Sequence, residues 1–403
     1  MGQTNCESDP TMRPSASKGG ASNPIRILIV APSLDILGGQ AVQADRLLRR
    51  LQQELSIEVG FLPINPRLPG AFRKFQSIKY LRTIATSLMY WALLLTKVRK
   101  FDVIHVFSAS YFSFLLAPTP AILVGKLFGK KIVLNYHSGE ASDHLQRWRR
   151  TAIPTIRLVD EVAVPSDYLV RVFKSFNLSA KAIYNLVDVD DFPFRSRDPI
   201  RPVFLSNRNF EVHYGVDRVL RAFSLIQKRY PDARLTIAGH GPERLSLEAL
   251  AGDLSLRNTE FIGRVPHQEI ARAYDQADVF INGSKIDNQP LSLLEAFACG
   301  LPVVTSDAGG IPDIVANEKT GLLVRGGDYE ALAVAALRVV EDNELAQRLI
   351  IQAHQELDKY SWPVLRKQWL DFYCGVSETT AVIPPTVVDN DVISAKSGIG
   401  GRS

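Results

Sequence analysis

The chain has 403 residues, more than one ordinary hydrophobic core accommodates, so its length indicates two domains. Apolar residues make up 46% and charged residues 22%, a composition that excludes a disordered or fibrous protein. The net charge of +5 is too small to indicate nucleic-acid binding, and three widely spaced cysteines indicate neither a disulfide framework nor a metal site. We therefore expect a globular protein of the reducing cytoplasm.

Both ends of the chain have the composition of loose tails. Residues 1–24 are mostly polar and small, and they lack the apolar core that a secretory signal needs. Residues 377–403 are rich in Thr, Pro, Gly and Ser. We expect both tails to be disordered and the folded structure to lie between them.

Short apolar runs rich in β-branched residues alternate with helix-length patterns along the rest of the chain. This alternation predicts an α/β protein of repeated βα units, with parallel sheets buried on both faces. The first domain is expected at 25–195, with strands at 25–30, 57–62, 103–107, 131–136, 161–164 and 182–184. Ligands of such sheets bind outside the carboxyl ends of the strands, so we expect the site residues there.

The turn after the first strand contains Gly38 and Gly39, and a helix is expected to start near Gly39. Paired glycines allow backbone N–H groups to approach an anion, and the start of a helix favours negative charge. Both glycines are therefore candidate contacts of a phosphate or an acceptor. The alternative is an ordinary βα loop that uses glycine for a tight turn.

A basic segment without acidic residues follows the second strand. No acidic residue lies between Glu58 and Asp102, while basic residues surround the apolar run 84–95: Arg67, Arg73, Lys74, Lys79, Arg82, Lys97, Arg99 and Lys100. The run is too short to cross a bilayer, which needs about 20 apolar residues. A basic amphipathic helix can instead lie on an anionic membrane surface, so 67–100 is a candidate membrane contact. The alternative is a core helix with solvated basic ends.

Prolines and charges at 194–201 interrupt the pattern, and we expect the linker between the domains there. The second domain is expected at 196–358, with strands at 203–206, 234–238, 261–262, 279–281, 303–305 and 322–324. Two helices are predicted near 329–340 and 344–357. A last helix is predicted near 362–373, within a segment expected at 359–376.

The run from Asp287 to Asp313 is the densest motif of the chain. Pro290 suits a first helical position, and it would leave the amides of Leu291 and Ser292 free to face a diphosphate. Glu295 falls on an apolar stripe of the same helix, where a carboxylate needs hydrogen-bond donors. A ribose diol would supply two donors; the alternative is a structural carboxylate bonded to backbone or arginine.

This motif resembles the signature of the retaining glycosyltransferase family 4, and the resemblance extends from about residue 25 to residue 373. It implies the GT-B fold: two Rossmann-like domains face a central cleft, and the last helix returns to pack on the N-terminal domain. It also implies that Glu295 holds the donor ribose and that Asp287, where the family has glutamate, lies near the transferred sugar. His137, at the end of a strand, resembles the family's histidine beside that sugar; a lone histidine there is otherwise structural.

The segment 206–215 resembles the family's Arg-x5-Lys-Gly segment, whose two cations hold the donor diphosphate. Arg208 is present, but Tyr214 occupies the lysine position and His213 precedes it, so His213 is a candidate partial substitute. Gly263 and Val265 resemble the segment whose backbone contacts the nucleotide base. Leu186 replaces the glycine of the family's Asn-Gly-Val-Asp turn.

The resemblance implies a retaining, metal-independent sugar transfer from a nucleotide-diphosphate sugar, with no cofactor. The expected acceptor is a saccharide or glycolipid of surface polysaccharide biosynthesis, and the expected place is the cytoplasm or the cytoplasmic membrane face. Tyr214 and Leu186 leave open a catalytically weak GT-B scaffold that acts as a binding or regulatory subunit. A nucleotide-sugar epimerase or a phosphorylase of similar fold is a further alternative.

Overall fold

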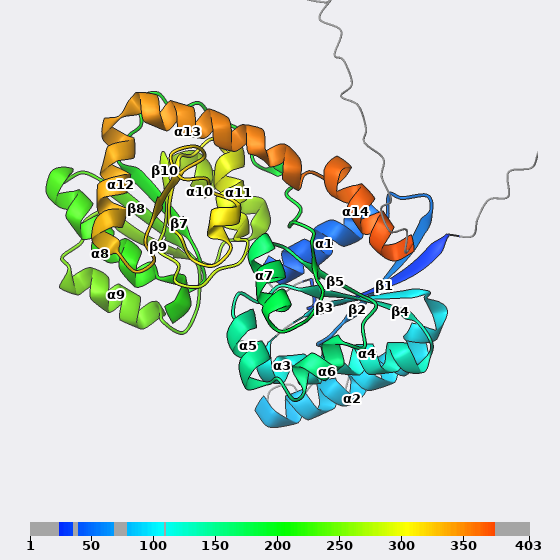
Figure 1. Cartoon of the computed structure of the whole chain (residues 1–403). Helices are drawn as coiled ribbons and strands as arrows, with labels where there is room; N and C mark the ends of the chain where they lie inside the picture. Colours follow the sequence, from blue (N-terminus) through cyan, green and yellow to red (C-terminus); the bar gives the residue numbers. More distant parts are fainter. Residues whose placement is uncertain (1–23, 35–38, 68–78, 109, 375–403) are drawn as a thin grey trace, which may run out of the picture.

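The computed structural model describes residues 24–34, 39–67, 79–108 and 110–374. The two predicted tails therefore lie outside the described residues, apart from Pro24. Two parallel six-stranded sheets lie side by side, each with helices on both faces, so the predicted α/β architecture is confirmed (Figure 1). We call the two halves the first unit, which contains the sheet β1–β6, and the second unit, which contains the sheet β7–β12.

The first unit follows the predicted strands closely, with the order β2-β1-β3-β4-β5-β6. Its strands are β1 (Ile25–Ala31), β2 (Ile57–Pro63), β3 (Val103–Ser108), β4 (Lys131–Tyr136), β5 (Glu161–Val164) and β6 (Lys181–Ala182). Its helices are α1 (Gly39–Leu51), α2 (Lys79–Lys97), α3 (Tyr111–Leu116), α4 (Pro118–Leu127), α5 (Ala141–Arg147), α6 (Ala152–Ile156) and α7 (Asp167–Ser175). Every residue of β3 is buried, as expected for a parallel strand covered on both faces.

The second unit has the strand order β12-β11-β10-β7-β8-β9. Its strands are β7 (Val203–Asn207), β8 (Arg234–Ala238), β9 (Thr259–Gly263), β10 (Val279–Asn282), β11 (Val303–Ser306) and β12 (Leu322–Val324). Its helices are α8 (Val216–Arg229), α9 (Arg244–Asp253), α10 (His267–Gln276), α11 (Leu291–Ala298), α12 (Tyr329–Glu341) and α13 (Asn343–Gln355). Helix α8 packs on this sheet through an amphipathic stripe that includes Val219, Phe223 and Ile226.

The chain passes between the units earlier than the proline cluster suggests. Leu186 packs in the core of the first unit, and Val187 packs in the core of the second. The segment 194–201 is held on the second unit, because Arg195, Arg197 and Arg201 all lie within ion-pair distance of the buried Asp278. The charges that interrupt the sequence pattern therefore form a structural cluster around the buried Asp278 and Arg197, and the segment is not a solvated linker.

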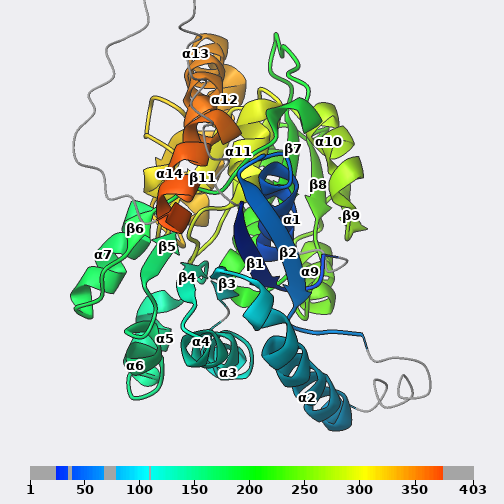
Figure 2. The same ribbon diagram turned by 90° about the vertical axis from the view of Figure 1, so that its right-hand side faces the viewer.

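The last helix, α14 (Trp362–Cys374), lies against the first unit (Figures 1 and 2). Its Leu365, Trp369 and Phe372 share a core with strands β1 and β3. Tyr373 Oη lies 2.8 Å from Nδ1 of His105, which is fully buried on β3. The His105 ring also stacks on Phe107, so this histidine has a packing role.

Both sheets reverse their strand order at one point, and both points face the space between the units. In the first sheet the reversal lies between β1 and β3; in the second it lies between β7 and β10. Loops that leave adjacent strands in opposite directions at such a point open a crevice at the carboxyl ends of the strands. The fold therefore places the loops after β1, β7 and β10 around one shared crevice.

Candidate active site

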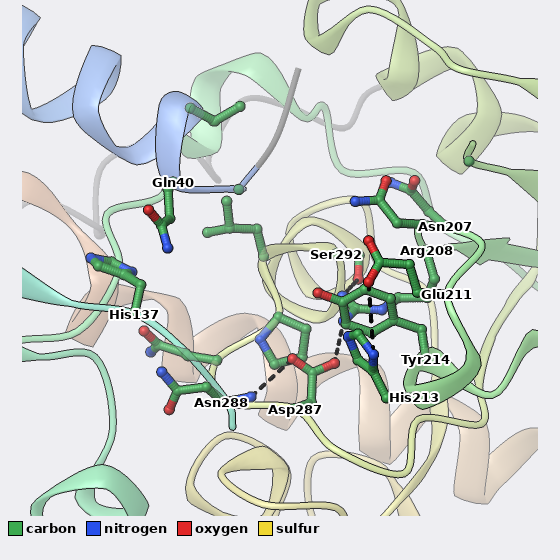
Figure 3. A pocket seen from close by; sticks show the side chains of 18 of the residues that line it. Gln40, His137, Asn207, Arg208, Glu211, His213, Tyr214, Asp287, Asn288 and Ser292 are labelled. Carbon is green, nitrogen blue, oxygen red and sulfur yellow. Dashed lines mark hydrogen bonds and ion pairs between the residues drawn. The ribbon is translucent and has the colours of Figure 1, made fainter. Parts of the chain in front are cut away.

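A cavity of about 520 Å³ lies between the two units. The first unit lines it with the start of α1 and with the loop after β4, residues 137–140. The second unit lines it with residues that follow β7, β8, β9 and β10 and with the start of α11. Figure 3 shows Gln40 and His137 on one side and Arg208, Tyr214 and Asp287 on the other.

Helix α11 directs its N-terminus into this cavity. The helix begins at Leu291, with Pro290 as the N-cap residue, one position later than the sequence pattern indicates. The first backbone bond of the helix runs from the Leu293 amide to the Pro290 carbonyl at 3.2 Å. The amides of Leu291 and Ser292 therefore precede the helical bonding pattern and can donate to an anion, and both residues line the cavity.

Arg208 lies beside this helix start. Its guanidinium pairs with Asp287, and Nη1 lies 3.4 Å from Ser292 Oγ. The guanidinium carbon also lies 4.2 Å from the centre of the Tyr214 ring (Figure 3). Arg208 Nε is buried and has no hydrogen-bond partner among the residues described. Arg208 is thus held in place by its neighbours on the cavity wall.

Tyr214 therefore contributes to the site as a ring rather than as a second cation. Burial raises the pKa of its phenol, so the side chain stays neutral at physiological pH. His213 packs on Tyr214, with ring centres 4.2 Å apart, and its Nδ1 lies 3.8 Å from Glu211. Both His213 and Tyr214 line the cavity. A diphosphate here would meet one fixed guanidinium, an imidazole and a phenol.

Asp287 is 8% exposed, and its carboxylate is bound on several sides. Ser284 Oγ donates to Oδ2 at 3.1 Å, and the Asn288 amide donates to Oδ1 at 2.9 Å. Its backbone carbonyl accepts from the Gly310 amide at 3.1 Å, and a Cβ on Gly309 would lie 2.0 Å from the same oxygen. The Gly309-Gly310 pair is thus needed for close packing against the 287–288 backbone.

Glu295 has protein partners from both units. Its Oε2 accepts from Tyr274 Oη at 2.9 Å, and its Oε1 lies 3.7 Å from Nη2 of Arg46 on α1. The carboxylate is 5% exposed and lines the cavity. An arginine partner was one of the two interpretations of this residue, but the position of Glu295 on the cavity wall leaves a ligand contact available.

His137 lies on the first-unit wall. Its ring stacks on Phe107 with centres 5.3 Å apart, and its Nε2 is buried without a hydrogen-bond partner among the described residues. Burial lowers the pKa of His137 to about 4, so the imidazole is neutral near pH 7. Gln40 lies on the same side of the cavity (Figure 3), and its amide donates to the Ser108 carbonyl at 2.8 Å. A neutral imidazole can hold a sugar hydroxyl.

The other sequence candidates fall in different places. Gly39 and Val265 line the cavity, and Gly38 lies outside the described residues. Gly263 is not among the lining residues; its carbonyl accepts from the Gly239 amide at 2.8 Å, so it links two loops. Sequence reasoning missed several polar lining residues that flank its motifs: Glu140, Asn185, Asn207, His240, Arg264 and Gln289.

The described residues contain neither a metal-binding group of side chains nor a helix suited to cross a membrane. No group of three or more His, Cys, Asp or Glu side chains there has an arrangement that could hold a metal ion. Within those same residues, no helix combines the length and the apolar character that crossing a membrane requires. Cys299 and Cys374 are both free thiols, and Cys299 is buried.

Comparison with known proteins gives matches over most of the chain. A family model described as Glycosyl transferases group 1 matches residues 190–356, and one described as Glycosyltransferase Family 4 matches residues 37–191. The GDP-mannose-dependent alpha-(1-6)-phosphatidylinositol monomannoside mannosyltransferase of Mycolicibacterium smegmatis is 30% identical, over 61% of this chain and 72% of that protein. Sulfoquinovosyl transferase SQD2 of Arabidopsis thaliana is 28% identical, over 85% of this chain and 72% of that protein.

Among solved structures, Anabaena Alr3699/HepE in complex with UDP and glucose has a TM-score of 0.68 and 18% identity. The match covers 87% of this chain and 100% of that one. At this identity the likeness is one of fold, and it confirms the predicted GT-B arrangement of two Rossmann-like sheets.

Proposed function

This chain belongs to the group 1 glycosyl transferases, and on that premise we propose that it transfers a sugar from a nucleotide-diphosphate sugar to an acceptor. We further propose that the transfer retains the configuration at the anomeric carbon and needs no metal ion. The observation that carries the proposal is the second-unit wall, where Arg208, the start of α11 and Glu295 converge on one cavity. This wall presents donors for a diphosphate next to a carboxylate for a diol.

In this proposal the diphosphate lies between Arg208 and the amides of Leu291 and Ser292. It competes with Asp287 for the guanidinium, since Asp287 now pairs with Arg208. A displaced Asp287 carboxylate can accept a hydrogen bond from a sugar hydroxyl. The ribose then lies against Glu295, and the base lies near Val265.

The sugar would lie between Asp287 and His137, at the junction of the two walls. The bond between the anomeric carbon and the leaving phosphate oxygen breaks, and the acceptor oxygen forms the new bond on the same face. The departing phosphate oxygen takes the acceptor proton. Arg208 and the start of α11 stabilise the negative charge that grows on the nucleoside diphosphate, which is the largest electrostatic contribution available here.

The proposed acceptor is a glycolipid or a lipid-linked saccharide of surface polysaccharide biosynthesis. A relative is named for a phosphatidylinositol monomannoside acceptor. Helix α2 exposes five large apolar side chains at spacings of three and four residues: Leu81, Ile84, Leu88, Trp91 and Leu95. The exposed Arg82, Arg99 and Lys100 lie at its two ends, and the helix has no acidic residue. This surface suits an anionic membrane, so we propose peripheral binding at the cytoplasmic membrane face.

A donor panel tests the proposed activity. Purified protein is incubated with the UDP, GDP and ADP forms of glucose, and with GDP-mannose, in the presence of bacterial lipid extract, and nucleoside diphosphate release is measured. We expect release with one nucleotide, unchanged by EDTA and strongly reduced in a Glu295→Gln variant. The anomeric proton of the early product, followed by NMR, should keep the donor's configuration. Release from no donor, or an inverted product, contradicts the proposal.

Vesicle sedimentation tests the membrane contact. Wild-type protein should sediment with vesicles that contain phosphatidylglycerol and remain in solution with phosphatidylcholine alone. An Ile84→Gln, Leu88→Gln variant should lose most of this binding, while a Val334→Gln variant, which changes an exposed apolar residue of the second unit, should keep it. Failure to bind anionic vesicles, with activity retained on a soluble acceptor, contradicts the membrane contact.

One observation favours a second candidate function, a catalytically weak GT-B scaffold that acts as a binding or regulatory subunit. Tyr214, at the position where the family has lysine, removes one of the two cations of the family's Arg-x5-Lys-Gly segment and leaves Arg208 as the other. The two functions differ in the cell. Replacing Glu295 with alanine abolishes the phenotype of an enzyme, whereas an intact phenotype in that variant indicates a scaffold.

A further inference from the structure

We propose that Arg46 of the first unit is a positioning residue for Glu295. Arg46 would orient, from across the cleft, the second-unit carboxylate that holds the sugar donor. The inference rests on the proposed function, because it concerns the same donor site. Arg46 belongs to α1, and no motif of the sequence singles it out. In the structure it is 2% exposed, one of the largest fully buried side chains described.

Arg46 joins three parts of the molecule. Nη1 donates to the Leu186 carbonyl at 2.9 Å, at the point where the chain passes between the units. Nε lies 3.8 Å from Asp188 Oδ2, and Nη2 lies 3.7 Å from Glu295 Oε1. The planar guanidinium can make these contacts together because its donors point in fixed directions. Arg46 therefore links α1 and the interdomain turn to α11.

The neighbouring side chain Gln43 holds the same turn. Its Nε2 donates to the Leu186 carbonyl at 2.8 Å, and its Oε1 accepts from the Leu186 amide at 2.8 Å. The backbone that Arg46 contacts is thus fixed independently of Arg46. The ion pair with Glu295 connects Arg46 to the cavity wall.

Glu295 needs such support because its carboxylate is buried and must be oriented. Tyr274 fixes Oε2 from within the second unit, and burial keeps that phenol protonated by raising its pKa. Arg46 faces Oε1 from the other unit. With Tyr274 at one oxygen and Arg46 at the other, the carboxylate is held in one orientation on the cavity wall.

The arrangement also couples the two walls. Helix α1 carries Arg46 in its interior and lines the cavity with Gly39 and Gln40 at its N-terminus. Any movement of α1 relative to the second unit therefore changes the distance from Arg46 to Glu295 as well as the width of the cleft. Donor binding through Glu295 should be tightest in the arrangement seen here, in which α1 is docked.

Titration calorimetry with UDP, GDP and ADP tests the inference on six proteins: wild type, Arg46→Met, Arg46→Lys, Glu295→Gln, the Arg46→Met, Glu295→Gln double variant, and Arg50→Met. Arg50 lies on the same helix and pairs with Asp188 at 2.5 Å, so it is a matched control that has no ion pair with Glu295. Each variant is also checked for its melting temperature without nucleotide.

We expect Arg46→Met to weaken binding of the preferred nucleotide about tenfold, and Arg46→Lys to restore part of the loss. Arg50→Met should bind like wild type. In the Glu295→Gln background, Arg46→Met should cause no further loss, because its effect passes through the carboxylate. Equal losses from Arg46→Met in both backgrounds would show a general structural role and overturn the inference.

The outcomes separate the two proposals. If no nucleotide binds the wild type, or if Glu295→Gln binds as well as the wild type, the proposed function fails. If Glu295→Gln weakens binding and Arg46→Met does not, only the positioning role fails. If Arg46→Met does not fold, Arg46→Lys decides alone. Lysine is shorter and lacks the planar guanidinium, so this variant should bind the nucleotide about threefold more weakly. Unchanged binding overturns the inference.

Discussion

The two walls of the cavity differ in how their polar groups are satisfied. On the second-unit wall, charges are paired before any ligand arrives: Arg208 with Asp287, and Glu295 with Arg46 across the cleft. The first-unit wall at Gln40 and residues 137–140 carries the neutral His137, whose Nε2 has no partner among the described residues. The second-unit wall, with its ion pairs, suits a ligand of fixed charge, such as a diphosphate. The neutral imidazole of His137 suits sugar hydroxyls, and Glu140 adds one carboxylate to this wall.

This difference implies that the two walls recognise their ligands in different ways. A nucleotide diphosphate presents the same charges whatever sugar it carries, and a wall built for it needs the same few residues. An acceptor is recognised by hydroxyls in a particular arrangement, and small changes of neutral side chains alter that recognition. The following variants test the contrast between the walls, beginning with the largest expected effect.

Replacing Arg208 by methionine should have the largest effect. The change removes the permanent cation from the proposed diphosphate site, and we expect the rate of nucleoside diphosphate release to fall about 100-fold. Arg229→Met is a matched control, because Arg229 forms an exposed ion pair with Glu341 on another surface. A rate within a factor of two of wild type would mean that the diphosphate binds elsewhere.

Replacing His137 by phenylalanine should slow sugar transfer through its effect on the first-unit wall. The ring stack on Phe107 is preserved, but a hydrogen bond to the sugar is lost, so transfer should slow about tenfold. Binding of UDP, GDP or ADP without a sugar should be unchanged. Because burial lowers the pKa of His137 to about 4, its titration should leave no step in the rate between pH 6 and 8. Weakened binding of the bare nucleotide would contradict the separation of the walls.

The pH dependence of stability should also distinguish the units, because the first unit contains buried neutral histidines. Burial lowers the pKa of His105 to about 3 and that of His144 to about 4, against 6.5 in the unfolded chain. Unfolding therefore takes up protons below pH 6.5. Stability is fully present above that pH and is lost as the pH falls towards 4, by about 1.4 kcal/mol per pH unit for each histidine.

Urea unfolding of a His144→Phe variant measures this contribution. His144 is fully buried, and its Nδ1 lies 2.8 Å from Tyr136 Oη, so the variant loses one hydrogen bond at every pH. Between pH 6 and 5 its free energy of unfolding should fall less steeply than that of wild type. Parallel curves for the two proteins would show that this imidazole is protonated in the folded state.

The smallest effects should come from Tyr214. Its ring lies over Arg208, so Tyr214→Phe should bind nucleotide like wild type, and Tyr214→Ala should bind about fivefold more weakly. Isothermal titration with the preferred nucleoside diphosphate measures both. A loss in Tyr214→Phe as large as in Tyr214→Ala would assign the contribution to the phenol oxygen instead of the ring.

Much of the fold could be predicted from local patterns. Eleven of the twelve strands overlap the predicted ranges by at least two residues, and β6 overlaps by one, because its pairing with β5 ends at Ala182. Buried parallel strands have continuous apolar runs, and these runs can be recognised in the sequence. The segment 194–201 is harder to predict, because the arginines that pair with the buried Asp278 give it the composition of a solvated linker.

The candidate site could be predicted where its residues are contiguous. Asp287, Leu291, Ser292 and Glu295 follow one another around a single helix start, so one motif contains them all. The partners of that motif come from distant segments: Tyr274 from α10, and Arg46 from the first unit. Sequence spacing carries no signal for such contacts. The stacking of Tyr214 on Arg208 likewise depends on a turn that only the structure reveals.

Hydrogen exchange with and without UDP, GDP or ADP tests the central claim most directly, because it locates the donor on one of the two walls. We predict that the nucleotide that binds slows exchange most at 208–214 and 290–295 of the second unit, and least at 137–140 of the first. A Glu295→Gln variant should show weaker protection at both second-unit segments. Protection that is strongest at 137–140, or unchanged exchange at 290–295 with bound nucleotide, would contradict the account.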